Sequence, residues 1–350
     1  MVNAYVVSSE AYAGKTLTCL VLGTRWRRRE LRVGYMKPLG LLSTIVSGQV
    51  TDEDALFVAG HLSFEAPPSQ LCPILVGPEL CHEDPEELRS RVSDAFSAIS
   101  AGQDVMLLGG LGSAFSRGST FGLSATSLAE LLDAKVVLVS RADSFLAADS
   151  VVAAAQVFGE RLAGVILNRA PDSERSDLEG EVLPCLAKRG LPILGILPDD
   201  PLLSSVSIEE IAKATGGEFL TGASQAESLV EDFVVGAMGV DSALRYFRKA
   251  ARKCVITGGD RTDVQFAALE TPTKCLILTG HLQPSHRVLA RADELRVPVL
   301  LVRDDTLTTI GTIERMLGKQ RVRERTKIDH ALAMFESNLA LDRLDAALGL

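Results

Sequence analysis

The loop after the first apolar segment constrains this chain more than any other stretch of its sequence. It lies between an apolar run at residues 4–7 and an amphipathic stretch that begins at Thr16. A short strand, a tight turn and a helix in this order are the context in which Gly-Lys-Thr binds phosphate. The helix N-terminus offers unpaired N–H groups and a partial positive charge, and Lys15 adds an ammonium group. The sequence therefore predicts a nucleotide-binding loop made of Ser9, Glu10, Ala11, Tyr12, Ala13, Gly14, Lys15 and Thr16.

Composition excludes several classes of protein. The 350 residues are enough for two domains, and the formal net charge of −9 argues against nucleic acid as a partner. No stretch reaches the roughly 18 uninterrupted apolar residues of a membrane span. The N-terminus lacks a basic leader, so we expect a cytoplasmic protein without a membrane partner. The six cysteines form no C-x-x-C pair, which favours buried free thiols over a zinc site or disulfides.

Strand and helix patterns alternate through the first 220 residues. After the first strand, short apolar runs occur at 31–36, 104–108, 135–140, 164–167 and 192–197. Helical patterns separate these runs, and one of them spans 144–158. This order predicts an α/β fold with a parallel sheet covered on both faces. The spacing of Ser207 and Glu210 predicts a capping box at the start of the last helix of this domain.

Polar residues at the ends of these strands are candidate ligand contacts, since ligands of open parallel sheets bind at the carboxyl ends of the strands. Lys37 follows the second strand and is either a second lysine over the phosphates or a surface lysine. Asp54 lies at the start of a helix that Thr51 is expected to cap, and its carboxylate is a candidate magnesium ligand. Asn168 either reads the edge of an adenine or forms a turn, and Pro198 ends the sixth strand.

The alternation of strands and helices resumes after a weaker region at 221–231. We expect this region to be a linker between a domain at 1–220 and a smaller α/β domain at 232–350 with a helical tail from residue 306. Gly259, Asp260 and Arg261 follow a strand of the second domain and are candidates for binding a phosphate or carboxylate. Alternatively, Asp260 caps the next helix and Arg261 forms an ion pair within the chain or across a dimer.

The first 220 residues resemble the dethiobiotin-synthetase-like branch of P-loop proteins, especially the form fused to the N-terminus of long phosphotransacetylases. The matching segments are 8–16, 35–38, 52–55, 164–169 and 195–198. The resemblance implies a three-layer P-loop NTPase-like fold that binds ATP with Mg²⁺. In that family two lysines hold phosphates, a threonine and an aspartate hold the metal, and an asparagine recognises adenine. These roles fall on Lys15, Lys37, Thr16, Asp54 and Asn168.

The chain departs from this family after its central strand. The family's Glu-Gly-Ala-Gly-Gly appears here as Gly109-Gly110-Leu111-Gly112-Ser113, so an acidic residue that helps hold magnesium is absent. Phosphoryl transfer depends on the placement of the metal and on charge stabilisation. The loss argues against catalysis and leaves nucleotide binding open.

The second half resembles the DRTGG domain, a regulatory module that lies between the ATPase-like and catalytic domains of long phosphotransacetylases. Asp260, Arg261 and Thr262 match the motif, while Asp263 and Val264 replace its two glycines. The two resemblances cover nearly the whole chain, so no acetyltransferase catalytic domain is expected within it.

Three hypotheses remain. The first is a nucleotide-responsive sensor or regulatory protein of the phosphotransacetylase N-terminal type, with effector sensing or a homodimer contact in its second domain. The second is an ATP-dependent carboxylate-activating or ligase enzyme related to dethiobiotin synthetase. The third is a degenerate scaffold that binds no nucleotide, which the replacement of the first loop glycine by Ser9 favours.

Overall fold

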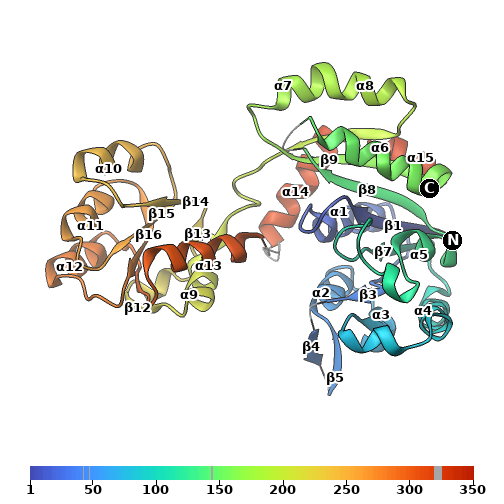
Figure 1. Ribbon diagram of the computed structural model, residues 1–350, viewed down its shortest axis with the longest axis horizontal. Coiled ribbons are helices and arrows are strands. Elements are labelled where there is room, and N and C mark those ends of the chain that lie inside the picture. The colour runs from blue at the N-terminus through green and yellow to red at the C-terminus, as the bar shows by residue number, and fades with distance from the viewer. Residues whose placement is uncertain (42, 47, 143–144, 319–324) are drawn as a thin grey trace. The chain divides into compact units, whose positions relative to one another are not determined.

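The computed structural model describes residues 1–41, 43–46, 48–142, 145–318 and 325–350. They form two compact units, one of residues 1–199 and 321–350 and the other of residues 200–320. The first unit contains a six-stranded parallel sheet with the strand order β10-β9-β8-β1-β7-β2 (Figure 1). Its strands are β1 (Val2–Ser8), β2 (Val33–Met36), β7 (Val105–Gly109), β8 (Lys135–Arg141), β9 (Leu162–Ala170) and β10 (Ile193–Pro198).

Both faces of this sheet are buried. Tyr5 and Val7 of β1 share a core with α4 (Pro85–Ser100), α5 (Ala125–Leu131) and α6 (Ala147–Phe158). Ala4 and Val6 are equally buried but point to the opposite face, because successive side chains of a strand alternate. On that face α1 (Lys15–Arg28) contacts β1 and β7. The expected three-layer parallel arrangement is therefore confirmed.

Two helical stretches differ in detail from the sequence pattern. The helical pattern between the fifth and sixth predicted strands is built from α7 (Arg175–Asp177), a π-helical turn η4 (Leu178–Val182) and α8 (Leu183–Lys188). The start of the helix expected at 144–158 lies outside the described residues, and α6 is described from Ala147.

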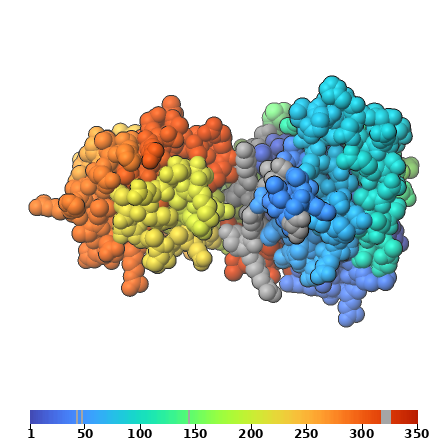
Figure 2. All heavy atoms as spheres, turned by 90° about the horizontal axis from the view of Figure 1, so that it is seen from below, coloured from blue at the N-terminus to red at the C-terminus, as the bar shows by residue number. Residues whose placement is uncertain are grey.

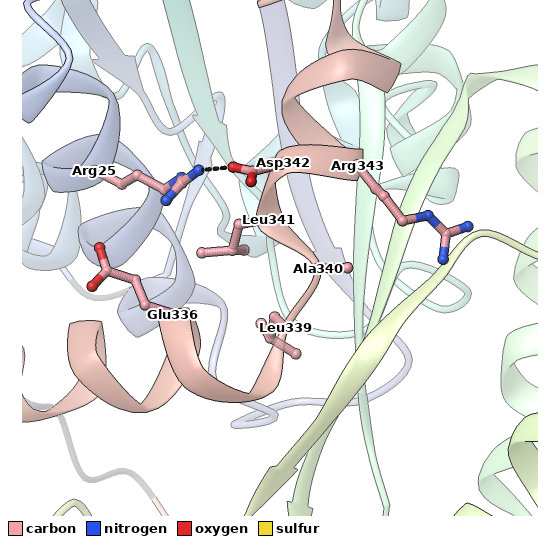
Figure 3. A pocket seen from close by; sticks show the side chains of 7 residues that line it. All are labelled: Arg25, Glu336, Leu339, Ala340, Leu341, Asp342 and Arg343. Atoms are coloured by element: carbon pink, nitrogen blue, oxygen red, sulfur yellow. Dashed lines mark hydrogen bonds and ion pairs between the residues drawn. The ribbon is translucent and has the colours of Figure 1, made fainter.

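The C-terminal helices α14 (Arg325–Asn338) and α15 (Leu341–Leu348) belong to the first unit. The N–H of Ala340, between them, donates to the carbonyl oxygen of Leu194 at 2.8 Å, and α15 contacts β9 and β1. A hollow of about 340 Å³ lies at this junction, where Arg25 of α1 reaches Asp342 of α15 at 2.5 Å (Figure 3). Of the helical tail expected in the second domain, α13 (Thr306–Gly318) lies in the second unit, whereas α14 and α15 pack on the first unit, where their apolar side chains are buried.

The second unit contains a five-stranded sheet with the order β12-β17-β16-β15-β14. Four strands are parallel: β14 (Asp232–Val235), β15 (Lys253–Gly258), β16 (Thr273–Thr279) and β17 (Val299–Leu301). The edge strand β12 (Glu218–Thr221) is antiparallel to β17 and is not expected from the sequence. The remaining helices are α9 (Ile208–Thr215), α10 (Val240–Phe247), α11 (Thr262–Leu269), α12 (His286–Glu294) and α13 (Thr306–Gly318).

The boundary between the units differs from the expected boundary at residue 220. Helix α9 and strand β12 belong to the second unit, so the change occurs near residue 200. The expected linker at 221–231 includes β13 (Leu229–Val230), which pairs with β11 (Val206–Ser207). The predicted capping box is present, since Glu210 N donates to Ser207 Oγ at 3.2 Å and Ser207 N to Glu210 Oε2 at 3.0 Å.

Between β2 and β7 the chain adds small elements to the first unit. These are β3 (Leu39–Gly40), β4 (Ser43–Val46), β5 (Gln49–Asp52), α2 (Glu53–His61), α3 (Pro68–Leu71), β6 (Ile74–Leu75) and the 3-10 helix η1 (Pro78–His82). Figure 2 views the molecule from the side of the β4–β5 hairpin, on which Ile45 and Val50 pair and are exposed. Among the described residues, no helix combines the length and the apolar character needed to cross a membrane.

Candidate functional site

The predicted phosphate loop lies at the carboxyl edge of the six-stranded sheet, between β1 and α1. β1 is central in the sheet. The chain leaves it toward β2 on one side, whereas it leaves β8 toward β9 on the other. Such a reversal opens a crevice between the carboxyl ends of neighbouring strands, where ligands of open α/β sheets bind. The loop therefore lies where a ligand is expected.

The ammonium group of Lys15, the first residue of α1, is held within this edge. Its Nζ donates to Ser8 Oγ at 2.6 Å and to the carbonyl oxygen of Gly112 at 2.7 Å. Burial, with a contribution from the charge of Lys37, lowers the pKa of Lys15 to about 8. Both present acceptors are neutral oxygens. A phosphate oxygen would give the ammonium an anionic partner and a stronger, charge-assisted hydrogen bond.

Neighbouring strand ends brace the loop. Ser9 Oγ lies 3.1 Å from Ser140 Oγ at the end of β8, and Ser113 Oγ donates to the carbonyl oxygen of Ser9 at 2.7 Å. Gly14 has a φ of 109°, a conformation that favours glycine. A Cβ at Gly14 would come within 2.5 Å of Asn168 Nδ2. The loop thus has a defined shape, although Ser9 replaces the first glycine of the motif.

Asn168, which is buried at the end of β9, is one of these braces. Its Nδ2 donates to the carbonyl oxygen of Ala13 at 2.8 Å, and its Oδ1 accepts from Arg169 N at 2.9 Å. Pro198 ends the neighbouring strand β10 and pairs with Ala170. The adenine contact expected of Asn168 stays a prediction, since its amide group has a second N–H and a second lone pair.

Lys37 is buried rather than a surface lysine, and it joins two carboxylates. Its Nζ lies 2.8 Å from Asp52 Oδ1 and 3.1 Å from Asp54 Oδ2. Burial alone would lower the pKa of Lys37, but the charges of Asp54 and Asp52 outweigh burial and raise it. Lys37 therefore stays an ammonium ion at neutral pH.

Asp52, and not Thr51, caps α2. Asp52 Oδ1 accepts from Ala55 N at 3.0 Å, and Oδ2 accepts from Leu41 N at 2.9 Å. The Thr51 hydroxyl instead donates to the carbonyl oxygen of Pro68 at 3.1 Å. A carboxylate is the stronger acceptor for a helix N-terminus.

Tyr35 fills the space beside Gly109, the residue that replaces the family's acid. A Cβ at Gly109 would come within 2.3 Å of the Tyr35 hydroxyl oxygen. Tyr35 is almost fully buried, and burial, with contributions from the charges of Asp54 and Asp52, holds the pKa of its hydroxyl well above the usual range. The neutral phenol of Tyr35 therefore occupies the space that the Cβ of the family's acidic residue would need at position 109.

These residues do not fit the magnesium site expected at Thr16 and Asp54. Magnesium takes six oxygen ligands in an octahedron and often binds through carboxylates. The carboxylates of Asp52 and Asp54 both hold the Lys37 ammonium, and Gly109 supplies no third carboxylate. A divalent cation beside Asp54 would lie close to a buried ammonium group, and like charges repel strongly at low dielectric.

The second-unit candidates lie in the loop between β15 and α11. The carbonyl oxygens of Gly258 and Gly259 accept from Gln265 Nε2 at 2.9 and 3.0 Å. Arg261 contacts Asp263 at 3.4 Å and donates to the carbonyl oxygen of Met238 at 3.1 Å, so its expected internal ion pair is present. The expected helix cap by Asp260 is wrong, because the residue at the cap position is Arg261 and no side chain caps α11.

The cysteines follow the sequence prediction in part. All six are free; Cys19, Cys72, Cys254 and Cys275 are buried, whereas Cys81 and Cys185 are exposed. Within the described ranges, no group of three or more His, Cys, Asp or Glu side chains is arranged to hold a metal ion.

A family model described as an AAA domain matches residues 3–207, more than half of the chain. The chain belongs to this family. A model of the DRTGG domain matches residues 210–316 of this AAA-domain protein. The resemblance to a dethiobiotin-synthetase-like P-loop domain followed by a DRTGG domain is thereby confirmed, and so is the P-loop NTPase-like fold.

Curated relatives of this AAA-domain protein include phosphate acetyltransferases. That of Nitratidesulfovibrio vulgaris is 25% identical over an alignment covering 99% of this chain and 51% of the relative. That of Deinococcus radiodurans is 27% identical, with 77% and 39% covered. The chain thus spans about half the length, or less, of these relatives. Among solved structures, the MinD cell division protein of Aquifex aeolicus is 16% identical with a TM-score of 0.36, covering 58% of this chain and 84% of that one.

The sequence analysis does not predict two contacts of this site, that of Lys37 with Asp52 and that of Tyr35 with Gly109. The sequence pattern explains Asp52 as part of an acidic helix start. The Asp-x-Asp spacing could have indicated that Asp52 and Asp54 hold one lysine together. The contact of Tyr35 with Gly109 joins residues on adjacent strands, β2 and β7. No local pattern carries that information.

Proposed function

We propose that this AAA-domain protein is a nucleotide-binding regulatory or sensor protein of the kind found in the N-terminal part of long phosphotransacetylases. The nucleotide, ATP or a related one, lies over residues 9–16, with its phosphates on the N-terminus of α1 and on Lys15. The observation that carries this proposal is the position of the Lys15 ammonium. It lies half-buried at the carboxyl edge of a parallel sheet and donates to two neutral oxygens.

The second unit carries the regulatory part of the proposal. We assign effector sensing to the loop of Gly259, Asp260 and Arg261 and self-association to the same unit, as its DRTGG match suggests. Arg261 supports this assignment because its guanidinium group is partly exposed while it contacts Asp263 and Met238. Magnesium is not part of the proposal, since Asp54 is paired with Lys37.

Calorimetric titration with ATP and magnesium tests the proposal. Wild-type protein is expected to bind, and Lys15→Ala to bind at least about tenfold more weakly, because a hydrogen bond to a charged group is worth about 1.5–3 kcal/mol. The matched control is Lys135→Ala. Lys135 is an exposed lysine at the start of β8, at the opposite edge of the sheet, and its loss should leave the affinity unchanged. Absence of binding by the wild-type protein would contradict the proposal and favour a scaffold.

A ligase or carboxylate-activating enzyme is the alternative. Such an enzyme needs a bound metal ion that stabilises the charge developing on the transferred phosphoryl group. The contact between Tyr35 and Gly109 and the pairing of both carboxylates with Lys37 weigh against it.

A further inference from the structure

We propose that Lys37 takes the place of a divalent cation and that the first unit binds its nucleotide without a metal ion. This inference rests on the proposed function, because it concerns how the same loop holds a nucleotide. It departs from what the resemblance to dethiobiotin synthetase implies for Thr16 and Asp54.

The first argument is that the ion cluster of Lys37, Asp52 and Asp54 is built into the fold. Lys37 N donates to the carbonyl oxygen of Leu71 at 2.8 Å, so the lysine backbone is fixed at the end of β2. Asp52 is fixed by its bonds from Leu41 N and Ala55 N. Removing the ammonium would take a cation away from two buried carboxylates, which is strongly unfavourable.

The second argument is that Lys37 retains the donor capacity a phosphate needs. An ammonium group has three N–H donors. In the described contacts two of them serve Asp52 and Asp54. The third is available to a phosphate oxygen. Lys15 follows β1 and Lys37 follows β2, which lies two strands away at the same carboxyl edge of the sheet, so one polyphosphate at that edge can reach both.

The third argument is that Tyr35 fills the space in which the family's second acidic metal ligand, at the position of Gly109, would lie. The Tyr35 hydroxyl lies where a side chain of residue 109 would have to begin. A carboxylate there would require Tyr35 to move out of a nearly fully buried position. With one fixed ammonium and no carboxylate from the central strand, the site is suited to holding a nucleotide rather than to transferring its phosphoryl group.

The decisive experiment compares ADP binding by the full chain in excess magnesium and in EDTA. We expect binding in EDTA to be at least as tight as in excess magnesium, because magnesium that chelates the ADP phosphates competes with Lys15 and Lys37 for them. Binding that appears only with magnesium would overturn the inference and leave the proposed function standing. No binding of ADP or ATP under either condition would overturn both.

A substitution at Lys37 tests the cation itself. Lys37→Met is expected to bind ADP at least about tenfold more weakly in EDTA, because the phosphates then lose a cation and lie near two carboxylates that no longer hold it. It is also expected to take up Mn²⁺ in the presence of ADP, as detected by electron paramagnetic resonance. Lys135→Met is the matched control and should change neither result. An unchanged ADP affinity of folded Lys37→Met in EDTA would overturn the inference.

The same resonance measurement on wild-type protein keeps the test independent of that variant's folding. With ADP present, no bound Mn²⁺ signal is expected beyond that of Mn²⁺ with ADP alone. Stoichiometric Mn²⁺ in the complex with wild-type protein would show that a metal displaces Lys37 and would overturn the inference.

Discussion

Gly14 is the residue at which the shape of the phosphate loop depends most directly on the lack of a side chain. Gly14→Ala places a Cβ within 2.5 Å of Asn168 Nδ2 and forces a φ of 109° on alanine. We expect it to destabilise the first unit by about 1–3 kcal/mol. Denaturant unfolding followed by the fluorescence of Trp26, the single tryptophan, measures this.

Two comparisons make the Gly14 prediction specific. Gly60, which is exposed in α2 and has no atom within 4 Å of the point where a Cβ would lie, is the control. Gly60→Ala should stabilise the unit by up to about 1 kcal/mol through helix propensity. Combining Gly14→Ala with Asn168→Ala removes the clash, so the double variant should lose less stability than the sum of the two. Strictly additive losses would show that Asn168 does not press on this position.

At this scale the sequence predicts the local part of the site and little of the rest. The motif at 9–16 and the strand ends at Lys37 and Asn168 follow from local pattern, because parallel strands end at one edge. The partners of Lys37 cannot be predicted from the pattern, because they depend on how β5, which ends at Asp52, and α2, which contains Asp54, pack near the end of β2. The strand ends near Gly-Lys-Thr predict where the site lies. The contacts of each side chain depend on the tertiary structure.

Among the elements, α15 is held to α1 by one buried carboxylate. Asp345 accepts from Trp26 Nε1 at 2.8 Å, from Arg29 at 2.6 Å and from Arg25 at 3.0 Å. Asp345→Ala removes the acceptor of Trp26 and Arg29 and leaves Arg25 with Asp342. We expect a loss of about 2–3 kcal/mol, below the cost for fully buried pairs because the arginines are partly exposed. Denaturant unfolding followed by Trp26 fluorescence measures this loss, because Trp26 lies in the first unit.

The matched control is on the same helix and uses the same arginine. Asp342 lies 2.5 Å from Arg25, but its side chain is 97% exposed, whereas that of Asp345 is 5% exposed. Exposed ion pairs contribute about 0–1 kcal/mol, so Asp342→Ala should unfold nearly as the wild type does. Equal losses for the two variants would mean that burial does not decide the strength of this contact.

The main elements of both sheets are predictable, whereas the small and edge elements are not. Strands such as β8 and β9 are long, apolar and regularly separated by helices. β12 pairs antiparallel with β17, about 80 residues later in sequence, through a short run of mixed residues that resembles a connection. The two-residue strands β3 and β6 pair only with each other among the described strands, so neither is recognisable from its own sequence.

For the whole molecule, the division into units predicts which pieces of the chain fold alone. Position in sequence assigns the helical tail to the second domain, yet Phe335, Leu339 and Leu344 are buried in the first unit. Each such side chain contributes about 1.5–3 kcal/mol when buried, so a chain ending at residue 220 should lack several of these contributions and aggregate. A protein in which a flexible Gly/Ser linker replaces residues 200–320 retains them and should unfold cooperatively by Trp26 fluorescence.

Residues 200–320 alone provide the complementary piece. They contain the complete five-stranded sheet with its two core clusters, so we expect native-like circular dichroism and a single thermal transition. If the piece 1–220 folded as stably as the linked piece, the C-terminal helices would contribute nothing to the first unit. The boundary near residue 220 would then describe the folding units better than the boundary near residue 200. The boundary near residue 200 rests on contacts between residues that are far apart in the sequence, whereas the order of the sequence patterns does not argue for it.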